Sequence, residues 1–570
     1  MPERNARIAA VLDEIADLLD IQGANPFRVR AYRNAARTVG DLGTEVDVLM
    51  ERGTALTEIP GIGEDLAKKI VDILHTGTCE FLDQLHSELP AAITQLLKIP
   101  ALGPRRVKTL YQDLHIENLE QLLQAAQAGQ IRTLPGFGEK TEQRILEAVQ
   151  GHIAMARRHP LVVAAGYAES LADHLRSVEG VRRVEIAGSY RRMRATVGDI
   201  DMVAIAADST AIMDRFVSYP TVTQVLSKGP TRSSVLLAPG LQVDLRSLPG
   251  DSFGAAMVYF TGSKAHNIAI RRIGQERGLK INEYGVFRDQ SRIAGESEES
   301  VYGAIDLPWI PPELREDRGE IEAAQKGTLP KLVDMSDLRG DLHLRTKPGG
   351  TVAALVAAAR ARGLNYVAVV FDAAELAAAI ALDAERVRRE LAAIHRSASA
   401  TVLAGIEVGI GLDGKLDTPD ATMSQFDLVV AAVRDHLDLA PAEQTQRVLT
   451  ALQNPRVAML AQPLASEGAG GFEVDFAAIV RAATEHGVGL ELSLHPRRIP
   501  VPDSGLEIAR REGGRMVISS EAESVAELDT LRFSVGFARR GGLEAPQVLN
   551  SSPLSELCTW LDAHRAHGRR

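Results

Sequence analysis

The stretch GSYRRMRATVGDID, residues 188–201, together with VDLRS at 243–247, decides the fold of the middle of this chain. It predicts neighbouring strands that carry Asp199, Asp201 and Asp244. Because side chains alternate along a strand, Asp199 and Asp201 face the same side. Three convergent carboxylates can hold two divalent cations ~3.5–4 Å apart, which activates an attacking oxygen and stabilises a leaving one. The alternative is a pair of solvated strand aspartates, which we favour for a lone D-x-D but not for the full constellation.

Gly188 and Ser189 follow an apolar run and therefore predict a turn at the end of a strand. Their small size lets backbone N–H groups and the Ser189 hydroxyl reach a phosphate. Arg191 or Arg192 can act as a clamp on the same phosphate, because a guanidinium offers paired donors. The turn and the carboxylates together indicate phosphoryl-transfer chemistry.

Composition limits the possible classes of protein. The 570 residues are 45% apolar and 24% charged, which is typical of a globular protein of about three to five domains. Two cysteines, Cys79 and Cys558, exclude a disulfide scaffold. The start of the chain has no signal-peptide pattern and no apolar run reaches ~18 residues, so we expect a cytoplasmic protein without membrane contact. The net charge is −11, but positive charge clusters locally at 105–108, 191–194 and 271–272, and such patches decide phosphate contact.

Three related pieces recur in the first 150 residues: IPGIGEDLAKKI from Ile59, IPALGPRRVKTL from Ile99 and LPGFGEKTEQRI from Leu134. Each resembles the helix-hairpin-helix module, whose turn presents backbone N–H groups at a helix N-terminus to a DNA phosphate, independent of sequence. The candidate DNA-contacting glycines are Gly61, Gly63, Gly103, Gly136 and Gly138. In the second copy Ala101 replaces the first glycine. A well-capped helical turn also explains any one copy, but three copies favour DNA binding.

The rest of the chain alternates strand-like and helix-like stretches. Residues 151–305 carry the carboxylates, and a Pro-rich charged connector follows at 306–330. From about residue 335 a second α/β region begins. Its predicted helices are 352–362 and 373–395, and its predicted strands are 366–370, 427–433 and 488–494. Regular alternation of this kind favours a parallel sheet, closed or open.

The 188–201 stretch, VDLRS and YFTGSKAHN at 259–267 resemble the X-family DNA polymerases, the DNA polymerase beta type. The connector sequence WIPPELREDRGEI and DLH at 341–343 resemble bacterial members fused to a C-terminal PHP (polymerase and histidinol phosphatase) domain. This implies a multidomain α/β fold: a helical helix-hairpin-helix N-terminal region, a nucleotidyltransferase palm and thumb, and a C-terminal PHP (βα) barrel-like domain. The implied domains are a lyase-like DNA-binding domain at 1–90, helix-hairpin-helix fingers at 91–150, palm at 151–248, thumb at 249–315, linker at 316–335 and PHP domain at 336–570.

The resemblance also implies roles for individual residues. Asp199, Asp201 and Asp244 match the catalytic carboxylates that bind two Mg²⁺ or Mn²⁺ ions, with Asp244 nearest the primer 3′-hydroxyl. The residues that match nucleotide-binding positions are Gly188, Ser189, Arg192, Gly198, Tyr259, Phe260, Gly262, Lys264 and Asn267. Tyr259 to Gly262 would form the turn that excludes a ribose 2′-hydroxyl. Arg271 matches a contact to the template minor groove.

Two further sites depart from the family pattern. Lys69 matches the Schiff-base lysine of the 5′-deoxyribose-phosphate lyase, but Asp65, four residues earlier, favours its charged form. A surface ion pair on a DNA-binding helix is at least as good an interpretation. In the PHP region, which normally holds a cluster of metal ions on mostly His ligands, only His343 and Glu407 match. The replaced ligand positions hold Arg345, Gly350, Ala373, Arg434, Gln462, Glu521 and Glu523.

Cationic arginine at ligand positions repels metal ions, so we expect the PHP domain to lack a metal centre and the family's 3′–5′ exonuclease. The function that we predict is a DNA-directed DNA polymerase that fills short repair gaps, with gapped or nicked duplex DNA and dNTPs as partners, near the bacterial nucleoid. The alternatives are a template-independent nucleotidyltransferase, a non-catalytic DNA-binding scaffold and a PHP phosphoesterase. The motifs that contact duplex DNA argue against the template-independent enzyme. The intact carboxylates argue against the non-catalytic scaffold, and the lost PHP ligands argue against the phosphoesterase.

Overall fold

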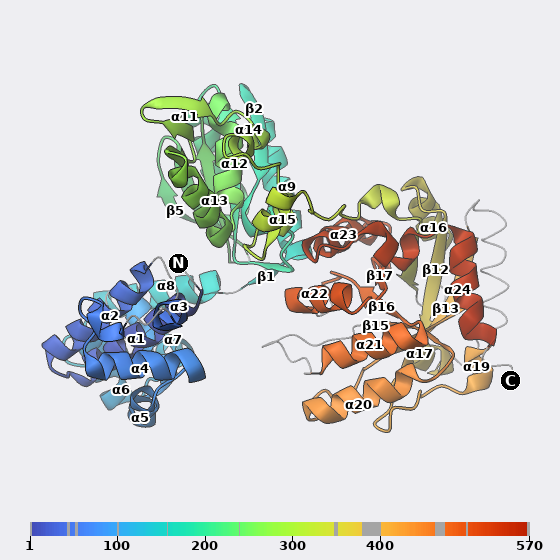
Figure 1. Cartoon of the computed structure of the whole chain (residues 1–570), viewed down its shortest axis with the longest axis horizontal. Helices are drawn as coiled ribbons and strands as arrows, with labels where there is room; N and C mark the ends of the chain where they lie inside the picture. The colour runs from blue at the N-terminus through green and yellow to red at the C-terminus, as the bar shows by residue number, and fades with distance from the viewer. Residues whose placement is uncertain are drawn as a thin grey trace. The chain divides into compact units, whose positions relative to one another are not determined.

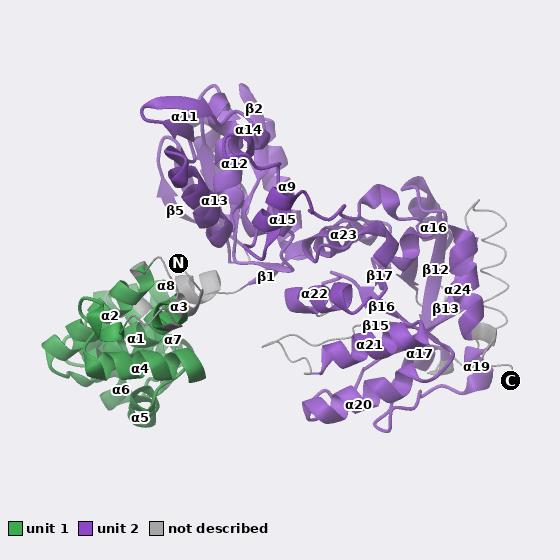
Figure 2. Cartoon of the chain, in the orientation of Figure 1, with its two compact units in different colours: residues 1–157 green, residues 158–570 purple. Residues whose placement is uncertain are grey.

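The chain folds as two compact units, residues 1–157 and 158–570 (Figure 2). The computed structural model describes residues 3–42, 46–51, 55–99, 102–156, 158–238, 240–346, 352–378, 401–461, 474–496 and 500–566. Among these residues, the longest apolar helical stretches fall short of what is needed to cross a membrane.

The first unit is built from helices (Figure 1), and these surround an apolar core. The helix α1 buries Leu12, Ile15 and Leu18, whose spacing places them on one face of the helix. The α-helices are α1 (Glu3–Gln22), α2 (Pro26–Asp41), α3 (Val46–Glu51), α4 (Glu64–Thr76), α5 (Glu80–Glu88), α6 (Pro104–Leu114), α7 (Leu119–Gln127) and α8 (Glu139–Ala156). The 3-10 helices are η1 (Leu56–Glu58), η2 (Ala91–Lys98) and η3 (Ile131–Thr133).

The second unit begins with a palm-thumb region, residues 158–334, whose centre is a five-stranded sheet in the order β2-β4-β7-β6-β5. These strands are β2 (Val181–Ile186), β4 (Asp199–Ala206), β5 (Val222–Lys228), β6 (Arg232–Leu237) and β7 (Leu241–Ser247). A short antiparallel pair joins β1 (His159–Pro160) to β3 (Thr196–Val197). The first helices are α9 (Leu161–Arg176), α10 (Gly188–Arg191) and α11 (Ser209–Val217).

The two faces of the five-stranded sheet are covered by different helices. Ile200 and Met202 of β4 belong to the core that contains residues of α9 and α11. Val203 and Ile205 belong instead to a small core with residues of α12 (Phe253–Thr261). Because side chains alternate along β4, the aspartates at its start point to the α12 side.

The thumb part contains a second sheet and four helices. Its antiparallel strands, in the order β10-β9-β8, are β8 (Leu279–Asn282), β9 (Gly285–Arg288) and β10 (Ser291–Ala294). Besides α12, its helices are α13 (Lys264–Glu276), α14 (Glu298–Gly303) and α15 (Glu320–Lys326), with η4 (Gly250–Ser252) and η5 (Pro312–Leu314). The predicted linker at 316–335 is ordered, because it contains α15 and contributes Ile321 and Ala324 to the thumb core.

The next part of the second unit, from residue 335 to 566, is a barrel region whose described residues form seven parallel strands in sequential order from β11 to β17. They are β11 (Gly340–Arg345), β12 (Tyr366–Asp372), β13 (Thr401–Gly409), β14 (Leu428–Ala432), β15 (Val457–Ala461), β16 (Gly489–Leu492) and β17 (Met516–Ile518). The helices are α16 (Val352–Ala361), α17 (Ala373–Ala378), α19 (Asp420–Met423), α20 (Pro441–Leu452), α21 (Phe476–His486), α22 (Asp503–Arg511), α23 (Leu531–Arg540) and α24 (Leu554–Ala566). The 3-10 helices are η6 (Met335–Asp337), η7 (Glu527–Thr530), η8 (Ala545–Gln547) and η9 (Leu549–Ser551).

A buried asparagine joins the first and last strands of this sheet. Asn550 Nδ2 donates to the Gly340 carbonyl of β11 and to the Ile518 carbonyl of β17, at 2.7 Å each. Its Oδ1 accepts from Ile518 N at 3.0 Å. The sheet is therefore nearly closed, which confirms the barrel-like fold. The predicted strands at 366–370, 427–433 and 488–494 are β12, β14 and β16. Of the predicted helix 373–395, residues 379–395 lie outside the described part of the chain.

Candidate active site

The three predicted metal-binding aspartates lie on adjacent parallel strands of the palm-thumb region. Asp201 of β4 stands opposite Asp244 of β7, and Asp199 stands opposite Gln242. The Gln242 side-chain amide donates to Asp244 Oδ1 at 3.1 Å. The fold therefore brings together carboxylates that lie about forty residues apart in the sequence.

The predicted phosphate turn forms a single helical turn, α10, directly after β2. Gly188 has a φ of 61°, and a Cβ added there would lie 2.5 Å from Asp201 Oδ2. Both the left-handed backbone and the close approach therefore require glycine. Ser189 Oγ is buried and accepts or donates no hydrogen bond among the described residues. A phosphate oxygen at this point would satisfy it.

These elements border a cleft of about 670 Å³. It is lined by Gly188, Ser189, Arg192, Asp199, Asp201, Tyr259, Phe260, Gly262, Lys264, Asn267, Ile268 and Arg271. Nearly all of the residues predicted to contact the nucleotide thus line one cavity, together with Asp199 and Asp201 of β4, although they come from α10, α12, α13 and the residues directly after α10 and α12. Gly198 and Asp244 lie outside this lining.

The two arginines of the turn have different partners. Arg191 forms a paired contact with Glu298 of the thumb, at 2.7 Å from each nitrogen, and donates to Thr261 Oγ1 at 2.8 Å. Arg192 donates to Glu316 Oε1 at 2.8 Å and to the carbonyl of Thr261. Arg191 is therefore committed to the thumb, whereas Arg192 lines the cleft and is the arginine available as a phosphate clamp.

Electrostatics at the carboxylates favour a bound cation. Burial, with the neighbouring charges of Asp199 and Asp244, raises the pKa of Asp201 to about 7. Burial and Asp244 also raise the pKa of Asp199. Carboxylates so crowded are stabilised by a divalent ion, and oxygen ligands are those that Mg²⁺ prefers. The residues present therefore fit the expected metal ions.

The predicted DNA-contacting glycines stand at open helix starts in the first unit. Gly63 and Gly103 are the N-caps of α4 and α6, and Gly138 directly precedes α8. Gly61 and Gly136 are left-handed, with φ of 86° and 83°. At all five glycines an added Cβ would meet no atom within 4 Å, so a phosphate can reach these backbone amides.

Lys69 lies on α4 and bonds Asp65, as its spacing predicts. Burial lowers the pKa of Lys69, but the hydrogen bond to Asp65 and the nearby Tyr32 outweigh it and raise the pKa. The amine is therefore held in its charged form, which is the wrong form for a Schiff-base nucleophile.

In the barrel region, two arginines occupy the centre where the strand ends converge. Arg434 contacts Glu407 Oε1 and Asp372 Oδ2, at 3.1 Å each. Arg345 contacts Glu407 Oε2 at 3.3 Å, and Glu521 and Glu523 at 3.8 Å. Guanidinium groups thus neutralise carboxylates that metal ions would otherwise bridge. Gly350 and Gln462, two other substituted ligand positions, lie outside the described residues.

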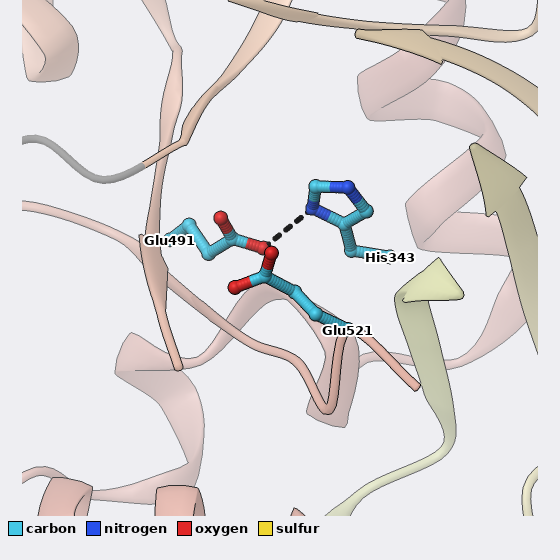
Figure 3. A group of neighbouring side chains, drawn as sticks. All are labelled: His343, Glu491 and Glu521. Atoms are coloured by element: carbon cyan, nitrogen blue, oxygen red, sulfur yellow. Dashed lines mark hydrogen bonds and ion pairs between the residues drawn. The ribbon is translucent and has the colours of Figure 1, made fainter. Parts of the chain in front are cut away.

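Figure 3 shows His343, Glu491 and Glu521, a buried group whose ligand atoms lie within 4.8 Å of one another. His343 Nδ1 bonds Glu491 Oε1 at 2.7 Å, and its Nε2 lies 3.3 Å from Glu407 Oε2. Burial alone would lower the pKa of His343, but Glu491 and Glu407 raise it to about 10. An imidazolium has no lone pair for a metal, so a metal ion here would have to displace a proton.

Sequence reasoning did not identify Glu491, Glu298 or Glu316. The signal for Glu491 was its place in the apolar strand VGLELSL, where a lone carboxylate is fully buried and so needs a partner. Glu298 and Glu316 give no such signal, because the arginines of the phosphate turn with which they pair lie more than a hundred residues away in the chain.

Comparison with known proteins agrees with this architecture. Residues 256–316 match the DNA polymerase beta thumb family, 3–79 a helix-hairpin-helix domain and 93–150 a SAM-like helix-hairpin-helix tandem. The chain is 30% identical over 570 residues to "DNA polymerase/3'-5' exonuclease PolX" of Bacillus subtilis, covering 97% of this chain and 98% of that protein. It is 21% identical over 342 residues to DNA polymerase lambda of Rattus norvegicus, with 55% and 56% covered. A "Probable phosphatase" of Aeromonas hydrophila is 28% identical over 176 residues, with 29% and 70% covered.

A cleft with paired-strand aspartates, a beta-type thumb and helix-hairpin-helix modules define a DNA polymerase of the nucleotidyltransferase class. Because the similarity extends over nearly the whole chain, the protein belongs to the bacterial X-family DNA polymerases that carry a C-terminal PHP domain. The barrel region is that PHP domain.

Proposed function

We propose that this polymerase fills short gaps in duplex DNA by two-metal nucleotidyl transfer, and that its PHP domain has no exonuclease activity. The observation that carries the polymerase part is the shared cleft, where aspartates, a phosphate turn and the Tyr259–Gly262 segment meet. Open helix-hairpin-helix amides supply contacts to the flanking duplex that do not depend on its sequence.

Each part of the cleft has a role in this proposal. Asp199, Asp201 and Asp244 hold the ions, which supply charge stabilisation for phosphoryl transfer when bound. Ser189 and Arg192 bind the triphosphate, and so they orient its α-phosphate toward the primer end. Asp244, on the strand beside Asp201, lies nearest the primer 3′-hydroxyl in this proposal and helps to remove its proton. Asn267 is held by a 2.7 Å bond from its Nδ2 to the Tyr259 carbonyl, and it lines the cleft where the incoming base would lie.

The direct test is Asp244→Ala. We expect nucleotide addition to be abolished and the affinity for gapped DNA to stay within about twofold, because duplex affinity comes mainly from phosphate contacts elsewhere. Asp214→Ala is the matched control, since Asp214 is an exposed aspartate of the same region paired with Lys228. A parallel loss of DNA affinity and activity would contradict the assignment. Equal incorporation on gapped and single-stranded primers would favour the template-independent alternative.

The second part of the proposal concerns the PHP centre. The Bacillus subtilis relative is named a 3'-5' exonuclease, so the activity is expected of the family. Here Arg345 and Arg434 bind the carboxylates of the centre, and His343 is held between two glutamates. The positive charge needed at this centre is therefore supplied by protein side chains rather than by ions.

The test is incubation with Mn²⁺ of a 3′-labelled duplex without dNTPs, together with elemental analysis of the purified protein. We expect no shortening of the labelled strand and no stoichiometric metal in the PHP domain. Shortening that survives Asp244→Ala and disappears in a His343→Ala, Glu407→Ala double variant would refute this part of the proposal.

A further inference from the structure

Helix α23 of the PHP domain packs directly against the phosphate turn of the palm. The rings of Phe533 and Tyr190 meet edge to face, with centroids 6.4 Å apart. Gly536 lies against Met193, since a Cβ added at Gly536 would be 2.6 Å from Met193 Cγ. Met193 itself has a φ of 54°, an uncommon backbone conformation for a non-glycine residue. The turn is therefore held in shape partly by a domain without an assigned activity in this chain.

A buried charge network joins the same helix to Arg192. Arg540, whose side chain is 1% exposed, contacts Glu316 Oε1 at 2.6 Å. The same Glu316 oxygen accepts from Arg192 Nε at 2.8 Å. Arg540 also donates to the main-chain carbonyl of Arg192 at 3.2 Å and to Asp503 Oδ1 at 2.9 Å. Glu316 is thus shared between one arginine of the PHP domain and one of the nucleotide cleft.

This sharing has a consequence for the charge of the cleft. With Arg540 present, the Glu316 carboxylate divides its charge between two guanidinium groups, so Arg192 keeps positive charge toward the cavity. Without Arg540, Glu316 would pair with Arg192 alone and neutralise it, and the carbonyl of Arg192 would lose a charged donor. Burial opposes ionisation of Glu316, yet Arg540 and Arg192 keep its pKa below the usual range, which agrees with the shared arrangement.

We propose that Arg540 is a positioning residue for the incoming nucleotide: the PHP domain, acting through Glu316 and the phosphate turn, sets the orientation and charge of Arg192. The inference rests on the proposed nucleotide site and assigns the PHP domain a role in the polymerase reaction that needs no metal centre.

The test compares Arg540→Met with Arg318→Met. Arg318 pairs with the same Asp503 and with Glu507, and its side chain contacts no residue of the turn among the described residues, so it is a matched control. For single-nucleotide addition on one gapped duplex, we expect Arg540→Met to raise the KM for dNTP by about tenfold, the value of roughly one charged hydrogen bond, with little change in kcat or DNA affinity. Arg540→Lys, which keeps the positive charge, should raise the KM less than Arg540→Met does. Arg318→Met should leave the KM unchanged.

Three further variants test the proposal when Arg540→Met alone does not. If Arg540→Met fails to fold, Gly536→Ala tests the same coupling without removing a charge: it should raise the KM by displacing Met193, and Met193→Ala in addition should reverse the rise. An unchanged KM in folded Arg540→Met, or an equal rise in Arg318→Met, would overturn the proposal. Ser189→Ala tests the proposed nucleotide site separately from the role of Arg540. It should raise the KM if the nucleotide site is correct, even if Arg540 has no effect on nucleotide binding.

Discussion

Replacing Asp201 by Asn should make the metal-free protein more stable while abolishing its activity. Asp201 lies across from Asp244 and beside Asp199, and a Cβ added at Gly188 would lie 2.5 Å from its Oδ2. Burial first, and then the two neighbouring carboxylates, raise its pKa from 3.8 to about 7. Without a cation, therefore, the ionised form of Asp201 destabilises the folded state.

The sign and size follow from proton linkage. A carboxyl with a raised pKa binds more protons in the folded state, so the free energy of unfolding falls as pH rises from about 4 to about 7. At ~1.4 kcal/mol per pH unit, the full difference is about 4 kcal/mol. This is an upper value, because the partner carboxylates adjust when Asp201 is neutralised. We expect Asp201→Asn to gain a few kcal/mol at pH 8 and much less at pH 5, where Asp201 is already protonated.

The assay is urea denaturation in EDTA at pH 5 and pH 8, with Asp214→Asn as an exposed control. Added Mg²⁺ should stabilise the wild type and have little effect on Asp201→Asn, since a bound ion neutralises the same charge cluster. If Asp201→Asn is no more stable than the wild type at pH 8 in EDTA, the reasoning is refuted. The ionised carboxylates would then not destabilise the folded protein when no cation is bound.

Three other predictions follow from individual sites. Borohydride trapping on a 5′-deoxyribose-phosphate end should give little adduct in the wild type, because Asp65 keeps Lys69 charged, and more in Asp65→Ala; strong trapping in the wild type would contradict this. Because the pKa of His343 is raised to about 10, its contribution to stability is complete below pH 6.5 and is lost as pH rises through 10. In urea denaturation, the free energy of unfolding should therefore fall less between pH 7 and pH 10 in His343→Gln than in the wild type. The segment Tyr259–Gly262 should favour dNTP over rNTP with Mg²⁺, and equal incorporation of both would show that it is not the sugar gate.

The sequence by itself determined the parts of this protein whose signal is local. The two-residue spacing of Asp199 and Asp201 predicts that both side chains lie on the same face of a strand. The three turns with proline and glycine predict where helices begin, because their backbone conformation leaves the first amides of a helix open. Alternating apolar strands and helices after residue 335 were enough to predict a parallel sheet. In each case the information lies within about a dozen neighbouring residues, where periodicity and turn chemistry act.

Only the tertiary structure decided which charges far apart in the sequence are paired. Glu316 lies 124 residues from Arg192 and 224 from Arg540, and Glu491 lies 148 from His343. Nothing in the local pattern around these carboxylates specifies a partner, because the pairing depends on where the folded chain brings distant segments together. Packing therefore decides whether an arginine can bind a phosphate or is held in a buried ion pair. The reason is that a buried charge without a partner destabilises the folded state.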